Sequence, residues 1–190
     1  MNKTQIIVIF FSTLMSAGFA LAEPSDKKNT SCPEYLDQDY RKLQSSKTVN
    51  LCDLKQQGPL LIVNSASHCG YSGQYSELED LYQKYKDQGL QVVAFTSDDF
   101  YQETNDEEKS AEICFVNYGV TFTVLAPTHV KKSKANTTFQ YLNSQTTPPK
   151  WNFNKYLVST NGLDIKHYGS SMDPLADQLE TDITAMLINE

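Results

Sequence analysis

Four cysteines carry the chemistry that this sequence could perform, and they stand at positions 32, 52, 69 and 114. No two of them have C-x-x-C spacing, and four cysteines allow three pairings. Cys69 is the best candidate nucleophile, because it follows an apolar run typical of a buried strand and precedes a helix-forming segment. The partial positive charge at a helix N-terminus favours the reactive thiolate. From position alone, an inert buried cysteine or half of a structural disulfide is an equally good interpretation.

Neither metal nor nucleic-acid chemistry is indicated. The histidines at 68, 129 and 167 include no pair four residues apart, so we expect no zinc site and predict no cofactor. The net charge of −7 argues against binding to nucleic acid or to an anionic membrane. An imidazolium at His68 would favour a thiolate at Cys69, but neighbouring side chains often point apart. His68 therefore stays a candidate modulator and not a required catalytic group.

The elements that position Cys69 form a predicted β-α-β unit. Residues 60–64 read as a buried strand after the Gly58-Pro59 turn signal. The Ser76-x-x-Glu79 pattern is typical of a capping box, and apolar residues at helical spacing continue to Gly89, a good stop signal. Residues 91–95 form the next strand. Short connections through a helix predict that the two strands are parallel.

The rest of the chain predicts a mixed sheet covered by helices, which is an α/β, thioredoxin-like fold with an N-terminal β-hairpin. Asp173 followed by Pro174 predicts the start of a last helix. A second capping box, Thr104-x-x-Glu107, opens a helix that we expect to run to about residue 117. The remaining expected elements are a hairpin of 40–43 with 48–51, a strand over 120–125, and a hairpin of 156–159 with 164–168 around Asn161-Gly162.

The N-terminus has the pattern of an export signal. Lys3 precedes an apolar stretch that is too short to span a membrane comfortably, and Ala20-Leu21-Ala22 is a small-x-small cleavage site. We predict a signal peptide over 1–22, a leader over 23–39 and one domain over 40–190. The mature chain would carry 15 basic and 23 acidic residues, with no stable membrane association after cleavage. Its compartment would be the periplasm or, as an alternative, the extracellular space.

Four blocks of the sequence resemble the glutathione peroxidase family, in the family's order. Residues 64–75, NSASHCGYSGQY, resemble its N-V-A-S-x-C-G-x-T-x-Q-Y, and residues 114–122, CFVNYGVTF, resemble C-x-x-N-Y-G-V-T-F. Residues 150–158, KWNFNKYLV, resemble W-N-F-x-K-F-L-V, and residues 81–90 are also similar to the family. The resemblance covers about residues 40–188. It implies a thioredoxin-like fold and peroxidase activity without a metal or organic cofactor.

The resemblance also implies a catalytic set. Cys69 takes the position of the residue that attacks peroxide, and Trp151 and Asn152 match the W-N pair directly. Gln102 is the candidate for the family's glutamine, although the segment 95–103 is one residue shorter than the family pattern and differs from it at several positions. Amide and indole N–H groups can donate towards a sulfur that carries negative charge.

Cys114 falls on the resolving cysteine of the family's two-cysteine branch, which a thioredoxin-type protein reduces. A sulfenic acid at Cys69 would condense with this thiol. Cys32 and Cys52 lie outside the matching blocks, and in an exported protein we interpret them as a structural disulfide. A small thiol is the alternative reductant, but no basic cluster can be assigned to the carboxylates of glutathione.

Two other functions stay open at this point. A thiol–disulfide oxidoreductase shares the fold, but Ser72 stands where its C-x-x-C motif would need the second cysteine. A non-catalytic sensor or binding module would account for the altered segment 95–103. Retention of Cys69, Trp151 and Asn152 argues against that module.

Overall fold

The structure is a computed structural model that describes Met1 and residues 32–188. The predicted signal peptide and the first part of the leader lie outside the described residues. No helix among the described residues is long and apolar enough to cross a membrane.

A five-stranded mixed sheet forms the centre of the fold, in the order β5-β4-β3-β6-β7. β3, β4 and β5 are parallel, whereas β6 and β7 run antiparallel to their neighbours. The parallel pairing predicted for the first two main strands is therefore confirmed. The strands are β3 (Leu60–Ser65), β4 (Gln91–Thr96), β5 (Thr123–Leu125), β6 (Lys155–Val158) and β7 (Ile165–Tyr168).

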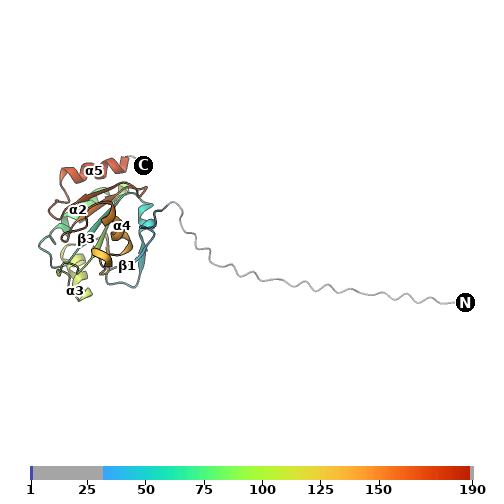
Figure 1. Cartoon of the computed structure of the whole chain (residues 1–190), viewed down its shortest axis with the longest axis horizontal. Helices are drawn as coiled ribbons and strands as arrows, with labels where there is room; N and C mark the ends of the chain where they lie inside the picture. Colours follow the sequence, from blue (N-terminus) through green and yellow to red (C-terminus); the bar gives the residue numbers. More distant parts are fainter. Residues whose placement is uncertain (2–31, 189–190) are drawn as a thin grey trace.

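Helices cover both faces of this sheet (Figure 1). Alternate residues of β3, β4 and β6 belong to two separate hydrophobic clusters, so these inner strands are buried on both sides. One cluster includes residues of α2 (Gln74–Tyr85), the π-helix η2 (Glu112–Asn117) and α5 (Asp177–Ile188). The other includes residues of α1 (Leu51–Lys55) and α4 (Thr137–Gln145). The shorter elements are η1 (Lys86–Gln88), α3 (Glu107–Ala111) and η3 (Lys132–Lys134).

The predicted capping boxes are both wrong. α2 begins two residues before Ser76, with Gly73 as an N-cap that makes no side-chain bond. Glu79 lies inside the helix, and its carboxylate accepts hydrogen bonds from the Thr121 N–H at 2.7 Å and the Thr121 hydroxyl at 2.6 Å. The Glu79 carboxylate therefore binds a residue 42 positions away instead of capping the helix, and local spacing does not reveal this contact.

The helix that carries Cys114 starts later than predicted and changes type. Its N-cap is Asp106, whose carboxylate accepts from the N–H groups of Glu108 and Lys109, while Thr104 lies outside the helix. The α-helical part ends at Ala111 and continues as the π-helix η2. A π-helical turn is rare and often marks a functional position.

The last helix also starts later than predicted. Asp173 accepts a hydrogen bond from the Leu175 N–H at 2.7 Å in a turn, and α5 begins only at Asp177. The C-terminal hairpin formed as predicted, with β6 and β7 joined around Gly162, which has a φ of 75°. This positive φ is one that glycine adopts readily.

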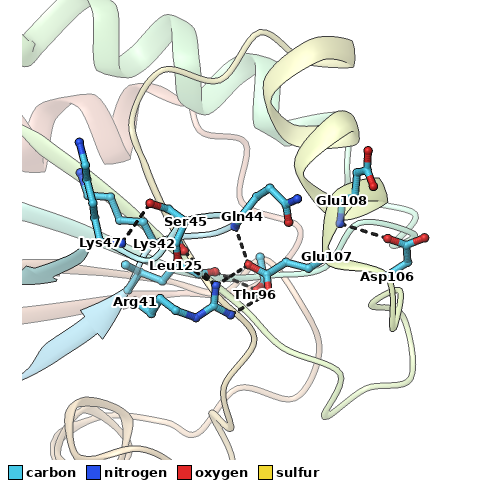
Figure 2. Close-up of polar contacts among 10 residues, drawn as sticks. All are labelled: Arg41, Lys42, Gln44, Ser45, Lys47, Thr96, Asp106, Glu107, Glu108 and Leu125. Carbon is cyan, nitrogen blue, oxygen red and sulfur yellow. Dashed lines mark hydrogen bonds and ion pairs between the residues drawn. The ribbon is translucent and has the colours of Figure 1, made fainter.

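The N-terminal hairpin consists of β1 (Asp39–Arg41) and β2 (Thr48–Asn50), as predicted in type and place. Arg41 binds both carboxylate oxygens of Glu107, each at 2.7 Å, and the Gln44 N–H also donates to Glu107 (Figure 2). The expected disulfide between Cys32 and Cys52 is present, with Cα atoms 6.0 Å apart. The hairpin is therefore fixed to α3 on one side, and the segment before it is fixed to α1.

Candidate active site

Cys69 lies in the turn that connects β3 to α2, with its side chain 3% exposed. Its sulfur accepts a hydrogen bond from the Tyr71 N–H at 3.5 Å, and its carbonyl accepts one from the Ser72 N–H at 2.9 Å. The thiol thus stands at the carboxyl end of the central strand, just before the N-terminus of a twelve-residue helix. Ligand and reaction sites of open α/β sheets gather at this end of the strands.

Asn64, at the end of β3, connects the Cys69 segment to the loop that carries Trp151 and Asn152. Its side-chain amide donates to the Trp151 carbonyl at 3.1 Å, and its side-chain oxygen accepts from the Asn154 N–H at 3.0 Å. Its backbone carbonyl accepts from the N–H of Phe153, a residue with a positive φ of 62°. These contacts hold a strained turn, and they bring the W-N pair to the end of the strand that leads to Cys69.

Asn152 and Trp151 differ sharply in their surroundings. Asn152 is fully buried, and its amide nitrogen has no hydrogen-bond partner among the described residues. A buried donor without a protein partner costs free energy, about 1–3 kcal/mol, so this amide is free to donate to a group that enters the site. The Trp151 side chain is 40% exposed and packs against the ring of Phe100, with ring centroids 5.7 Å apart. The Lys131 ammonium lies 4.2 Å from the centre of that Phe100 ring.

Gln102 is brought beside the Cys69 turn by its backbone. Its carbonyl accepts a hydrogen bond from the His68 N–H at 2.9 Å, although the two residues are far apart in the sequence. Its side-chain amide donates to the Tyr101 carbonyl at 2.8 Å and not to Cys69. Gln102 is therefore adjacent to the site, but its amide would have to turn to donate to a reacting atom. His68 itself is exposed.

Cys114 is fully buried in η2 and is a free thiol. Burial raises the pKa of Cys114 to about 11, the charge of Glu103 adds to the rise, and the nearby Tyr75 hydroxyl opposes it. Cys69 and Cys114 belong to the same hydrophobic cluster. A buried thiol with a raised pKa is unreactive, so Cys114 needs a change in η2 before it can act as a nucleophile.

Ser72 occupies the place where a C-x-x-C motif would carry its second thiol. Its hydroxyl is hydrogen-bonded to the hydroxyl of Tyr118 at 2.9 Å. Among the described residues, no group of three or more His, Cys, Asp or Glu side chains could hold a metal ion. Cys69 and Cys114 are the free thiols in the part of the chain that the structure describes.

Three residues that matter to this site were missed by the sequence analysis. Asn64 and Glu103 are buried polar residues that join separate loops, and Lys155 is a fully buried lysine. The Lys155 ammonium donates to Gln74, the first residue of α2, and to the Met172 carbonyl at 2.6 Å. Its burial lowers the pKa of Lys155 to about 8. For Asn64 and Lys155, the available signal was a polar residue within an apolar strand, because such residues are buried only when they are paired.

Comparison with known proteins agrees with this geometry. The family model described as "Glutathione peroxidase" matches residues 37–143. The chain is 43% identical over 143 residues to the glutathione peroxidase homolog BsaA of Halalkalibacterium halodurans, covering 72% of this chain and 89% of that protein. It is 42% identical over 134 residues to the glutathione peroxidase-like peroxiredoxin gpx1 of Schizosaccharomyces pombe, covering 67% and 84%. The crystal structure of T. cruzi GPX1 superposes with a TM-score of 0.61 at 25% identity, covering 80% and 95%.

Proposed function

The chain belongs to the glutathione peroxidase family as a cysteine-type peroxidase, and from this premise we propose that Cys69 is the residue that attacks the peroxide. The substrate is hydrogen peroxide or an organic hydroperoxide. The observation that carries this assignment is the convergence of three segments. Hydrogen bonds join the Cys69 turn to Gln102 through His68, and they join β3 to the Trp151–Asn152 loop through Asn64.

The first step forms a bond between the Cys69 sulfur and the outer peroxide oxygen, and it breaks the O–O bond. The leaving oxygen takes a proton and departs as water or an alcohol, which leaves a sulfenic acid at Cys69. The unpaired Asn152 amide and the Trp151 indole N–H are the donors that stabilise charge on the oxygens as the bond breaks. Gln102 supplies a third donor if its amide turns away from Tyr101.

The second step uses Cys114 as the resolving thiol. Its thiolate attacks the Cys69 sulfur, a disulfide forms, and the hydroxyl group leaves as water with the proton that Cys114 gave up. Cys114 is fully buried, so local opening of η2 precedes this step. A dithiol protein of the thioredoxin type then returns two electrons by thiol–disulfide exchange. A dithiol protein is therefore the expected reductant of the Cys69–Cys114 disulfide, and a single small thiol is the less suitable one.

We also propose that the chain is exported. The chain functions in the periplasm, after removal of residues 1–22. The Cys32–Cys52 disulfide supports this placement, because structural disulfides persist in oxidising compartments. Mass spectrometry of the exported form is expected to find Glu23 as the first residue. A full-length chain held in the membrane would contradict the proposal.

The decisive experiment compares Cys69→Ser with Cys114→Ser. Cys69→Ser is expected to abolish peroxide reduction, because a hydroxyl does not form the sulfenic acid. Cys114→Ser is expected to consume one equivalent of peroxide at Cys69 and then stall with a thioredoxin-type reductant. Normal sustained turnover of Cys114→Ser would show that an external thiol resolves the sulfenic acid. Full activity of Cys69→Ser would overturn the function itself.

A further inference from the structure

Glu103 is a buried carboxylate that the reaction described above does not use. It is 8% exposed, and within residues 32–188 it takes part in no ion pair. Its oxygens accept hydrogen bonds from the Ser67 hydroxyl at 2.7 Å, the Ser67 N–H at 3.0 Å and the Thr104 N–H at 3.0 Å. An unpaired buried charge is costly, so these neutral donors must hold it in place. A neutral amide would place an NH₂ donor against these N–H and O–H donors, so the site is built for a carboxylate.

Glu103 links the Cys69 turn to the segment that carries Gln102. Ser67 stands two residues before Cys69, and Gln102 directly precedes Glu103. The His68 N–H donates to the Gln102 carbonyl, next to the bonds between Ser67 and Glu103. Two adjacent residues of the Cys69 turn are thus fixed to two adjacent residues of the segment after β4. A shift of this segment would move the Cys69 sulfur relative to its donors.

We propose that Glu103 is a positioning residue of the peroxidase cycle, whose carboxylate fixes the Cys69 turn through Ser67. The inference rests on the proposed function, since it concerns the step in which Cys69 attacks the peroxide. Glu103 does not touch the peroxide. It acts through Ser67 on the place that the Cys69 sulfur takes.

The inference is tested by single-turnover oxidation of Cys69 in the otherwise native chain. Ser67→Ala deletes one of the bonds to Glu103 and is expected to slow oxidation about fivefold, the value of one hydrogen bond of about 1 kcal/mol. Glu103→Asp keeps the carboxylate on a shorter side chain, so it should also slow oxidation. Glu112→Gln removes an exposed acid and is the matched control, which is expected to oxidise at the native rate. Thermal unfolding of the same samples separates slower oxidation of folded protein from loss of the fold.

The outcomes separate this inference from the proposed function. A native chain that does not reduce peroxide would sink the function, whatever rates the Ser67 and Glu103 variants show. A fully active native chain whose Cys69 oxidation is unaffected by Ser67→Ala and Glu103→Asp would instead overturn the positioning role of Glu103 alone.

Discussion

Arg41 and Glu107 form two parallel hydrogen bonds of 2.7 Å that join the N-terminal hairpin to the first turn of α3. Arg41 lowers the pKa of Glu107, so the pair persists until the pH falls into the range where that carboxylate takes a proton. α3 continues directly into η2, which carries Cys114. The ion pair therefore fixes the first turn of α3, the helix from which η2 continues (Figure 2).

Arg41→Gln is expected to loosen this end. Amide hydrogen exchange over 107–111 should become faster, and formation of the Cys69–Cys114 disulfide after peroxide addition should speed up modestly. High salt should produce the same change in the native chain, because exposed ion pairs are screened. Lys109→Gln is the control, since its pair with Asp106 is longer at 3.5 Å and more exposed. Equal exchange rates in Arg41→Gln and the control would contradict this role.

Asn152→Ala tests the unpaired donor. The Asn152 amide nitrogen has no partner within residues 32–188, so its removal breaks no hydrogen bond from that atom there and should affect peroxide reduction more than stability. Loss of a preorganised donor costs about 10²–10³ in rate. Stopped-flow oxidation and thermal unfolding of the same variant measure the two effects. A large loss of stability with a normal rate per folded molecule would assign Asn152 to structure only.

Gln102→Ala tests whether the third donor is real. The side-chain amide of Gln102 donates to the Tyr101 carbonyl, whereas the backbone carbonyl of Gln102 accepts from the His68 N–H. The substitution keeps the backbone contact and removes the amide. We expect a rate loss of about 10²-fold if the amide turns towards the reacting oxygens. An unchanged rate would show that Gln102 contributes its backbone alone.

Cys114→Ala tests the raised pKa of Cys114 through its effect on stability. Cys114 has a pKa of about 11 in the folded chain, against an ordinary value of 9.0 for a free cysteine. The folded state therefore holds this proton more tightly, which stabilises the native chain below the ordinary value, and this contribution is lost as the pH rises to about 11. Two pH units correspond to roughly 3 kcal/mol. Denaturant unfolding should find the native chain's advantage over Cys114→Ala shrinking between pH 8 and 11, and a constant difference would argue against the shift.

The Cys32–Cys52 disulfide predicts a thermodynamic effect away from the active site. The bond closes a loop across 20 residues. The double change Cys32→Ser with Cys52→Ser is expected to lower the free energy of unfolding by about 3 kcal/mol on the chain-entropy model. The rate of Cys69 oxidation should stay close to that of the native chain under conditions where both are folded. Peptide mapping without reductant checks that the native pair is Cys32 with Cys52.

Local pattern was sufficient for the framework of the fold. The apolar run of β3, the helical spacing in α2 and the glycine stop at Gly89 identified the β-α-β unit that places Cys69. The Asn-Gly signal identified the hairpin of β6 and β7. These features depend on residues within a few positions of one another, so the sequence displays them directly. The catalytic set, in contrast, came from resemblance to a family and not from local physics.

Only the tertiary structure decided which polar groups meet. Ser67 and Glu103 are 36 residues apart, and Asn64 and Trp151 are 87 residues apart, yet each pair shares a hydrogen bond. The sequence marked Glu79 as a helix cap, but folding directed its carboxylate to Thr121. A side chain with several available partners binds the donor that the packed sheet and helices bring to it. Burial then sets the strength of that contact, because water no longer competes for the same atoms.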